Sequence, residues 1–393
     1  MNIAILGMGT VGKGVYEILK NIEGVEVKRV LARHSIDGYP EIDPIITNNI
    51  SDITSDESID LVVESIGGTK PAFEYLISCI EAKKHIVTPN KNLISSHFAE
   101  LIEQATANGV KLKFTSSVGG GIPWIYNLIR TKRCDKIESI RGIVNGTCNF
   151  ILDAMTRGNT DFEGSLKVAK KYGYAEADSS SDILGTDSLR KTVISSNIAF
   201  DSYVDEKDVN CFGIESVNNF DISYAEQNGC VIRLLMESEN FGDYISAYVE
   251  PAFCKCDSIE AGTVSNNNII ILKGRNIGTQ AFYGQGAGKL PTGESVVQDI
   301  LDIKDDIAND FDVSVFREKK LDNYATSHRY YLRIGTTEET ICNIVYGKNG
   351  KFDILGDIAV GITEPVSVAK MHSVAYKLKE NEIEVFFAGI REE

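Results

Sequence analysis

The sequence predicts an α/β protein in three parts: a doubly wound parallel sheet, an α+β middle region and a C-terminal ferredoxin-like unit. Strands and helices alternate from Asn2 to about Phe114, and such alternation produces a parallel sheet with right-handed crossovers. From about Arg130 the pattern becomes α+β. After about Arg317 the elements follow in the order βαββαβ, which is typical of ferredoxin-like units.

The first part opens with an apolar strand at 2–6, and the glycine-rich stretch GMGTVG follows at 7–12. A helix comes next, because Val11, Val15 and Ile18 recur at helical spacing. A strand, G-x-G-x-x-G and a helix form the context that a dinucleotide fingerprint requires. The glycines permit a tight turn and close approach to a pyrophosphate, and the helix N-terminus attracts phosphate. The sequence therefore predicts a Rossmann domain.

Apolar runs indicate the other elements of this domain. Strands are expected at 25–33, 61–64, 85–87 and 111–114, and helices at 71–83 and 96–108. The last three strands enter the loops SIGG, TPNKN and TSSVGGGIP. Because ligands bind beyond the carboxyl ends of such strands, we expect Lys91 of TPNKN beside the nicotinamide end of a cofactor.

The end of the second strand bears on the choice of cofactor. An NAD-selective site usually has Asp or Glu there, to bind the ribose 2′-hydroxyl. This chain has Ala32, Arg33 and His34, and a cation suits a 2′-phosphate, so NADP is predicted and NAD remains possible. The predicted cofactor-binding residues are Gly7, Gly9, Thr10, Val11, Gly12, Arg33, Ser65, Gly67, Lys91 and Gly286.

In the middle region, ESIRGIVNGTCNFIL predicts a strand, a turn at Asn145-Gly146 and the start of a helix. AYVEPAF and NIIILKG predict strands, whose apolar surface favours a homodimer or higher homo-oligomer. A second glycine-rich loop, which includes Gly286, precedes a helix that can return to the first domain. The expected domains are 1–130 with about 292–316 for dinucleotide binding, 131–291 for substrate and dimerisation, and 317–393.

Composition excludes several classes of function. The net charge of −16 over 393 residues argues against a nucleic-acid partner. No apolar run approaches the roughly 20 residues of a membrane span, and no signal peptide is visible. The eight cysteines are scattered, which favours reduced thiols, and no two of the five histidines are close enough to suggest a metal site. We expect a cytoplasmic protein with a small-molecule substrate.

The stretch GYAEADSSSDILGTDSLRK at 173–191 carries four carboxylates and ends in two cations. Acidic stretches of this kind usually lie on the solvated surface. Asp187 and Lys191, however, are four residues apart on a predicted helix, so their side chains project from one face. A surface ion pair has the same spacing, and the stretch alone leaves both interpretations open.

Taken together, seven motifs resemble those of homoserine dehydrogenases. They occur in the family order over roughly residues 1–310: GMGTVGKGV, VVESIGG, TPNK, SVGGGIP, GIVNGTCNFIL, GYAEAD with GTDSLRK, and GQGAGKLPTGESVVQD. The C-terminal unit resembles the regulatory ACT module of many members. The resemblance implies NAD(P)-dependent interconversion of L-homoserine and L-aspartate 4-semialdehyde, a step toward threonine and methionine.

The resemblance also implies residue roles. Glu176, Asp182 and Thr147 match substrate-binding positions, and Asp187 and Lys191 match the reaction centre. Lys191 is the expected general acid/base, and Lys91 can share that role. A free lysine has a pKa of about 10.4 and is a poor base at neutral pH. Burial lowers such a pKa and a carboxylate raises it, and the sequence does not decide which effect is larger.

Two segments depart from the family pattern. Phe114-Thr115-Ser116 stands where the family has F-E-A, so a glutamate is missing from a monovalent-cation site otherwise made of backbone carbonyls, here those of Val118, Gly120 and Ile122. GTTEETICN replaces the Asp-x-Pro-Gly turn at the effector site of ACT modules.

Two rival functions remain open at this point. One is an oxidoreductase of the same build that acts on another small amino aldehyde or alcohol. The other is a dinucleotide-sensing protein without turnover.

Overall fold

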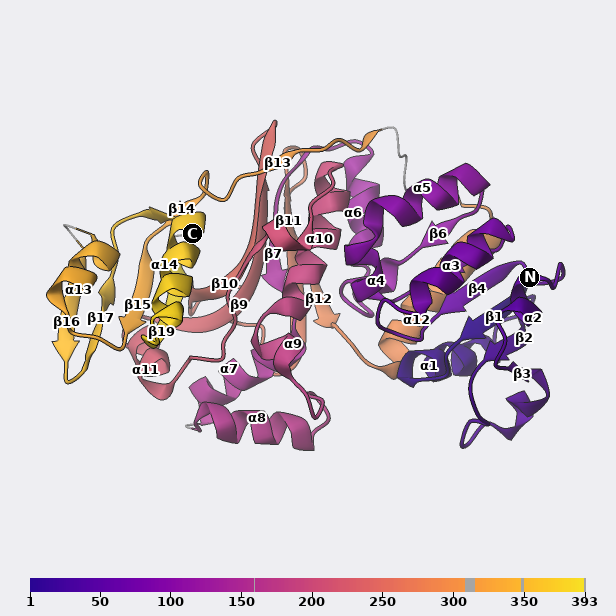
Figure 1. The fold of residues 1–393 in the computed structure, drawn as a ribbon, viewed down its shortest axis with the longest axis horizontal. Helices are drawn as coiled ribbons and strands as arrows, with labels where there is room; N and C mark the ends of the chain where they lie inside the picture. The colour runs from indigo at the N-terminus through magenta and orange to yellow at the C-terminus, as the bar shows by residue number, and fades with distance from the viewer. Residues whose placement is uncertain (159, 308–314, 348–349, 392–393) are drawn as a thin grey trace. The chain divides into compact units, whose positions relative to one another are not determined.

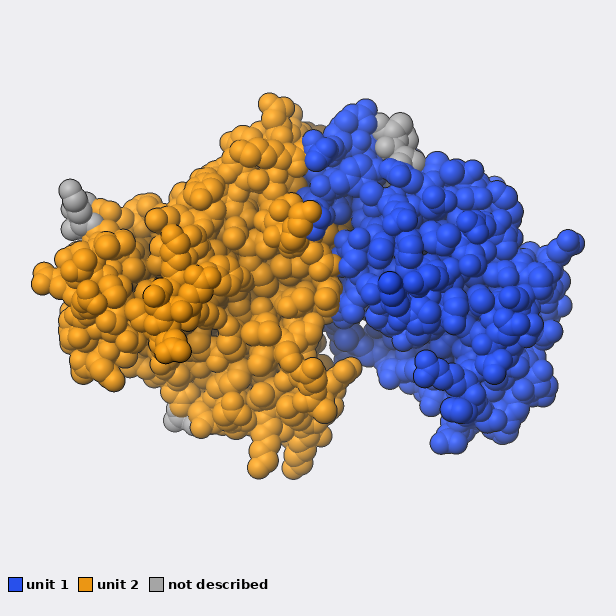
Figure 2. Space-filling model, viewed as in Figure 1, with its two compact units in different colours: residues 1–134, 197–205, 284–318 blue, residues 135–196, 206–283, 319–393 orange. Residues whose placement is uncertain are grey.

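The computed structural model describes residues 1–158, 160–307, 315–347 and 350–391 (Figure 1). The chain forms two compact units, each built from three segments (Figure 2). Unit 1 comprises 1–134, 197–205 and 284–318, and unit 2 comprises 135–196, 206–283 and 319–393. The separate domain expected at 317–393 stays a prediction. The expected return segment 292–316 includes 308–314, which lie outside the described residues.

Unit 1 contains the predicted doubly wound parallel sheet. The strand order is β3-β2-β1-β4-β5-β6, and all neighbours are parallel. The order reverses between β1 and β4, where open sheets of this kind bind ligands. The strands are β1 (Asn2–Leu6), β2 (Glu26–Leu31), β3 (Ile46–Thr47), β4 (Leu61–Glu64), β5 (His85–Val87) and β6 (Leu112–Lys113).

The longer helices of unit 1 cover this sheet, and the last of them comes from far along the chain. Val296 and Ile300 of that helix, α12, are buried in one core cluster with Val15 of α1. Glycine allows the two helices to touch, because a Cβ at Gly14 would lie 2.2 Å from the Lys289 carbonyl oxygen. The helices are α1 (Thr10–Leu19), α2 (Ser51–Thr54), α3 (Ala72–Glu81), α4 (Lys91–Ser96), α5 (Phe98–Asn108), α6 (Trp124–Lys132) and α12 (Lys289–Lys304), with 3-10 turns η1 (Pro40–Ile45) and η2 (Thr115–Ser117).

Unit 2 is built on a mixed sheet, in which β7, β9, β10 and β11 are the long strands of the predicted α+β region. β9 and β10 form an antiparallel pair along their whole lengths. The strands of this part are β7 (Ile137–Ile143), β8 (Asn210–Cys211), β9 (Cys230–Asn240), β10 (Tyr244–Lys255), β11 (Asn267–Gly274) and β12 (Gly278–Gln285). The helices are α7 (Gly146–Gly158), α8 (Phe162–Lys171), α9 (Ser180–Ile183), α10 (Thr186–Phe200) and α11 (Asn219–Gln227), with the 3-10 turn η3 (Glu206–Asp208). The end of α10, from Asn197, belongs to unit 1.

The C-terminal elements extend the same sheet in the order β19-β15-β17-β16, and these neighbours are antiparallel. β19 also pairs in parallel with β10, so the sheet is continuous. The relation to ACT modules stays a prediction. The elements are β13 (Lys320–Leu321), β14 (Ser327–His328), β15 (Tyr330–Ile334), α13 (Glu339–Tyr346), β16 (Lys351–Leu355), β17 (Ile358–Ile362), β18 (Val366–Ser367), α14 (Val368–Glu380) and β19 (Val385–Ile390).

A buried ion pair joins the C-terminal elements to the rest of unit 2. Arg333 of β15 donates from Nε to Asp221 Oδ1 at 2.8 Å and from Nη2 to Oδ2 at 3.1 Å. The Tyr331 hydroxyl donates to the same carboxylate at 2.6 Å. Asp221 side-chain exposure is 0% and that of Arg333 is 2%, so neither charge has water to replace its partner. Burial, the largest influence, raises the pKa of Asp221 although Arg333 opposes the shift.

Replacing Asp221 by Ala should therefore destabilise the protein strongly, because Arg333 would be left buried without its main partner. Breaking such a pair costs about 3–5 kcal/mol. The matched control is Glu384→Ala, because Glu384 also binds Arg333, at 2.6 Å, but its side chain is 59% exposed. The control should change stability by about 1 kcal/mol or less. Urea unfolding followed by circular dichroism measures both, and equal shifts in the two midpoints would contradict the assignment.

Candidate active site

The glycine-rich fingerprint has the geometry of a dinucleotide turn. Gly7 has a φ of 93°, which favours glycine. A Cβ at Gly12 would lie 2.2 Å from the Gly7 carbonyl oxygen, whereas a Cβ at Gly9 would meet nothing within 4 Å. The turn is closed by Ser65, whose Oγ donates to the Gly7 carbonyl at 2.8 Å. The first N–H groups of α1 have no partner within the helix, so the residues present fit a pyrophosphate in front of Gly9.

A buried carboxylate that sequence analysis did not single out holds the loops beside this turn. Glu64, at the end of β4, accepts hydrogen bonds from the Ile66 and Gly67 N–H groups at 2.7 and 3.2 Å and from Thr88 Oγ1 at 2.6 Å. Burial raises the pKa of Glu64, against the effect of these hydrogen bonds. Glu64 thus ties the SIGG turn to the segment before Lys91. The sequence signal that could have identified Glu64 is a carboxylate directly after the apolar run LVV.

Lys91 and Arg33 both follow strands of the parallel sheet, as predicted, but Lys91 is not in a loop. It is the first residue of α4, and Asn90 caps this helix by accepting from the Leu93 N–H at 3.2 Å. The polar composition of TPNKN suggested a loop, whereas the Asn90 side chain stabilises a helix start. Lys91 is half-buried, and Arg33 is exposed after β2.

The two glycine-rich loops of unit 1 cross each other closely. A Cβ at Gly120 would lie 2.7 Å from the Gly286 carbonyl oxygen, and the Gly121 N–H donates to the Gln285 carbonyl at 3.3 Å. Gly286 therefore lies beside the residues expected to form a cation site. The Gly120 carbonyl accepts from Ser295 Oγ at 2.7 Å, and the Ile122 carbonyl accepts from the Trp124 N–H at 2.7 Å. These bonds occupy one lone pair on each of two predicted ligand oxygens.

Thr115, which replaces the family glutamate, makes its own bonds to a buried acid. Its N–H and Oγ1 donate to the Asp299 carboxylate at 3.0 and 2.8 Å. Among the described residues, no group of three or more His, Cys, Asp or Glu is arranged to hold a metal ion. The cation site at Val118, Gly120 and Ile122 stays a prediction.

In unit 2 the acid-rich stretch forms a buried cluster. Lys191 of α10 donates to Asp187 Oδ2 at 2.8 Å and to the Val144 carbonyl at 2.5 Å. The side chains of Lys191 and Asp187 are only 8% and 7% exposed, so this is not the solvated pair that the same spacing usually gives. Asp182 is half-buried, and burial, the largest influence, raises the pKa of its carboxyl group.

Asn145 connects the members of this cluster. Its amide nitrogen donates to Asp182 Oδ1 at 2.7 Å and to Asp187 Oδ2 at 2.8 Å. Its amide oxygen accepts from the Cys148 N–H at 2.8 Å. Sequence analysis assigned Asn145 to a turn and missed this role. With two carboxylates around one ammonium, the cluster carries an excess of negative charge that suits a cationic amine.

The other two predicted substrate-binding residues are Thr147 and Glu176, and a hydrogen bond with Thr147 also acts to lower the pKa of Asp182, against the effect of burial. Thr147 is buried and donates from Oγ1 to the Tyr174 carbonyl at 2.5 Å, which fixes the chain two residues before Glu176. Glu176 itself is exposed. The structure thus brings together Asp182, Asp187 and Lys191, with Thr147 beside them, and leaves Glu176 at the surface.

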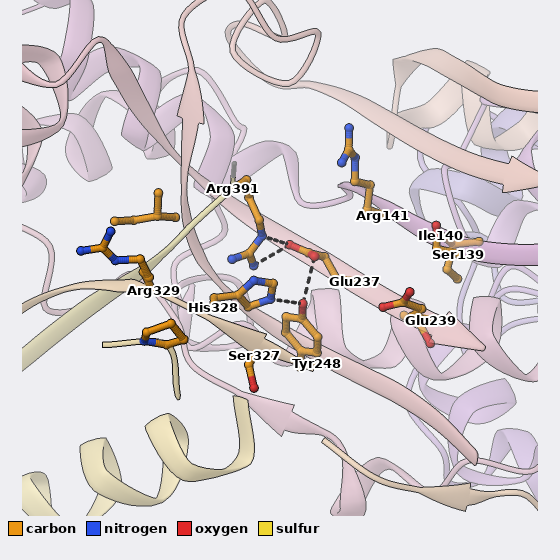
Figure 3. A pocket seen from close by; sticks show the side chains of 13 residues that line it. Ser139, Ile140, Arg141, Glu237, Glu239, Tyr248, Ser327, His328, Arg329 and Arg391 are labelled. Carbon is orange, nitrogen blue, oxygen red and sulfur yellow. Dashed lines mark hydrogen bonds and ion pairs between the residues drawn. The ribbon is translucent and has the colours of Figure 1, made fainter. Parts of the chain in front are cut away.

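A cavity of about 390 Å³ in unit 2 lies apart from the cluster (Figure 3). Its lining comes from β7, β9, β10 and the C-terminal elements, and includes none of the predicted site residues. The catalytic candidates are therefore defined by their hydrogen bonds and not by this cavity.

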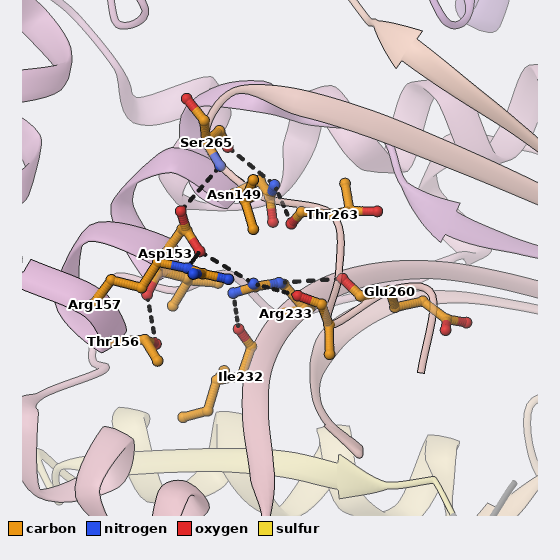
Figure 4. A network of polar contacts seen from close by, with 12 residues as sticks. Asn149, Asp153, Thr156, Arg157, Ile232, Arg233, Glu260, Thr263 and Ser265 are labelled. Carbon is orange, nitrogen blue, oxygen red and sulfur yellow. Dashed lines mark hydrogen bonds and ion pairs between the residues drawn. The ribbon is translucent and has the colours of Figure 1, made fainter. Parts of the chain in front are cut away.

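A polar network holds helix α7, whose N-terminus begins beside Asn145 (Figure 4). The Asn149 amide donates to the carbonyls of Thr263 and Ser265, both at 3.0 Å. Asp153 accepts from the Ser265 N–H at 3.0 Å and from the buried Arg233 at 3.4 Å. These bonds attach α7 to the loop after β10, which gives the Asn145 turn a rigid support.

The doubly wound sheet and its glycine-rich turn define a dinucleotide-binding oxidoreductase fold, which a second, α+β unit accompanies. Two family models match the chain: "Homoserine dehydrogenase, NAD binding domain" at residues 7–115 and "Homoserine dehydrogenase" at residues 123–301. The chain belongs to the homoserine dehydrogenase family.

Curated relatives agree with this assignment. The homoserine dehydrogenase of Bacillus subtilis is 35% identical over 314 residues, which cover 77% of this chain and 72% of that protein. That of Synechocystis is 38% identical over 317 residues, which cover 77% of this chain and 73% of that protein. These matches remove the two rival functions.

Solved structures resemble the chain over its whole length. A homoserine dehydrogenase from Thiobacillus denitrificans superposes with a TM-score of 0.88 at 29% identity and covers 100% of this chain and 98% of its own. One from S. aureus has a TM-score of 0.78 at 29% identity, with coverage of 100% and 99%. Within the described residues, no helix is long and apolar enough to cross a membrane.

The fingerprint glycines should respond differently to alanine. Gly12→Ala places a Cβ against the Gly7 carbonyl and should lower stability by about 1–3 kcal/mol. Gly9→Ala has room for its Cβ and should leave the melting temperature unchanged, but should weaken dinucleotide binding because the methyl group points where a pyrophosphate would lie. Thermal unfolding and cofactor fluorescence titration measure the two effects. Undiminished binding by folded Gly9→Ala protein would contradict the assignment of the turn.

Proposed function

We propose that this chain interconverts L-homoserine and L-aspartate 4-semialdehyde with NADP(H), and that Lys191 transfers the proton. The observation that supports this most strongly is the buried Asp187–Lys191 pair bridged to Asp182 by Asn145. The substrate carries an ammonium group, and a buried ammonium requires carboxylate acceptors. Asp182 is the proposed acceptor, assisted by Glu176 and Thr147.

The proton step follows from the partners of Lys191. When bound, the nicotinamide supplies or accepts the hydride at the terminal carbon of the substrate. Asp187 and the Val144 carbonyl both stabilise the ammonium form of Lys191, and this is the form that can donate a proton to an aldehyde oxygen. The cluster is therefore suited to acid catalysis in the direction of aldehyde reduction. Lys91, on the cofactor unit, is proposed to share in substrate binding or proton transfer.

Several finer assignments belong to the same proposal. NADP is the proposed preferred cofactor, because Arg33 is exposed where a 2′-phosphate is recognised. We infer a homodimer through the middle region, as the apolar strands suggest, and cytoplasmic localisation. A monovalent cation at the carbonyls of Val118, Gly120 and Ile122 is proposed to bind weakly at most, because the negative ligand is absent.

Replacing Lys191 by Met should abolish NADPH oxidation with aspartate semialdehyde while cofactor binding persists. Loss of general acid catalysis lowers kcat by ~10²–10⁴, and Met keeps most of the buried side-chain volume. Lys167→Met is the matched control, because Lys167 is an exposed lysine of α8, outside the acid-rich stretch. The control should retain turnover. A folded Lys191→Met enzyme with near-normal kcat would disprove the role.

Arg33→Ala should weaken NADPH selectively. A hydrogen bond to a charged group contributes about 1.5–3 kcal/mol, so the KM for NADPH should rise by roughly tenfold or more while that for NADH stays within about twofold. His34→Ala is the control, since it removes the neighbouring exposed side chain. Steady-state kinetics with both cofactors measure the difference, and an equal loss with NADPH and NADH would show that Arg33 does not contact the 2′-phosphate.

A further inference from the structure

A series of short contacts in unit 1 runs from the glycine fingerprint to the start of α4. The SIGG turn at 65–68 packs against the fingerprint, since a Cβ at Gly7 would lie 3.0 Å from the Ser65 carbonyl oxygen. Asn90 donates from Nδ2 to the Gly68 carbonyl at 2.7 Å. The two turns follow β1 and β4, the neighbouring strands at which the strand order reverses. The SIGG turn therefore lies where a sheet of this kind binds a dinucleotide.

The SIGG turn has little rigidity of its own. Gly67 and Gly68 have φ angles of 82° and 70°, and a Cβ on either glycine would meet nothing within 4 Å. Glycine loses more conformational freedom on folding than any other residue, so two glycines in succession keep one shape only where other groups hold them. The open space beside both glycines also leaves room for a ligand next to their backbone. The turn thus needs external support to present one surface to a dinucleotide.

Two side chains support the turn, one at each end. Glu64 accepts hydrogen bonds from the Ile66 and Gly67 N–H groups at 2.7 and 3.2 Å, and Asn90 holds the other end. Thr88 joins the two supports, because its Oγ1 donates to Glu64 Oε2 at 2.6 Å and accepts from the Asn90 N–H at 3.0 Å. Glu64, Thr88 and Asn90 are all buried. Water therefore cannot easily replace any of these bonds.

Asn90 uses both ends of its amide group. While Nδ2 donates to Gly68, Oδ1 accepts from the Leu93 N–H at 3.2 Å and so caps α4, whose first residue is Lys91. Aspartate or serine can cap a helix about as well as asparagine. A carboxylate, however, has no donor for the Gly68 carbonyl, and a serine hydroxyl is too close to its own backbone to reach as far. Helix capping alone therefore does not explain an asparagine at this position.

We propose that Asn90 is a positioning residue for the dinucleotide, which holds the Gly68 end of the SIGG turn in its binding conformation and ties that turn to the start of α4. Without this hydrogen bond the glycine pair samples more conformations. A ligand that binds only one of them then loses affinity in proportion to the fraction that remains competent. The inference rests on dinucleotide binding by unit 1, and on none of the roles proposed for Lys191, Lys91 and Arg33.

Asn90→Ser in the full-length protein tests the proposal, because serine keeps the helix cap and loses the donor to Gly68. In fluorescence titrations, the dissociation constants of NADPH and NADH should both rise roughly three- to tenfold, the loss expected for one neutral hydrogen bond. At saturating cofactor kcat should change less than about twofold, since a bound cofactor orders the turn. Asn21→Ser, at an exposed asparagine after the C-terminal end of α1, is the matched control and should leave both constants unchanged.

Two further variants separate the donor from the cap. Asn90→Asp also caps without donating and should lose at least as much affinity, whereas Asn90→Ala removes the cap too and should melt lower than Asn90→Ser but bind no more weakly. Unchanged affinity of folded Asn90→Ser and Asn90→Asp for both dinucleotides would overturn the proposal. A loss confined to Asn90→Ala would overturn it as well, and would assign the effect to the cap. If the unchanged protein bound neither dinucleotide, the proposed function would fail with it, so the two failures are distinguishable.

Discussion

The burial of the Asp187–Lys191 pair depends on hydrogen bonds that the Asn145 turn supplies. Charges removed from water are costly unless their remaining donors and acceptors are paired. Asn145 supplies one amide to both acids, and Val144 supplies a carbonyl to the ammonium group. This requirement explains why α7 is anchored so firmly by Asn149 and Asp153. A displaced α7 would move the Asn145 turn and leave the pair partly unsatisfied.

Sequence patterns were informative where local physics decides the structure. The strands expected at 61–64 and 85–87 match β4 and β5 to the residue, because the apolar runs LVV and IV within them are typical of strands buried on both faces. The glycine fingerprint likewise predicted a turn whose φ and close contact only glycine tolerates. α4 was missed because its start depends on one capping side chain, Asn90, within a segment of loop-like composition.

The candidate site was only partly predictable, since its main connections are tertiary. Asp187 and Lys191 could be paired by helical spacing, but nothing local shows that the pair is buried. Asn145 meets acids 37 and 42 residues further along the chain, and Glu64 meets Thr88 across two strands of the sheet. Single-sequence patterns contain no information on such contacts. The family resemblance supplied the residue roles, and the structure adds the supporting residues around them.

The contribution of α12 to unit 1 has a consequence for biosynthesis. The chain passes between the two units after residues 134, 196, 205, 283 and 318. The core of unit 1 nevertheless includes Val296, Ile300 and Ile303 together with Ile3 and Val15. A ribosome that has released the first 134 residues has therefore made the parallel sheet without the helix that seals it. Apolar surface on α1 must wait, exposed or held by a chaperone, until about 170 further residues have been translated.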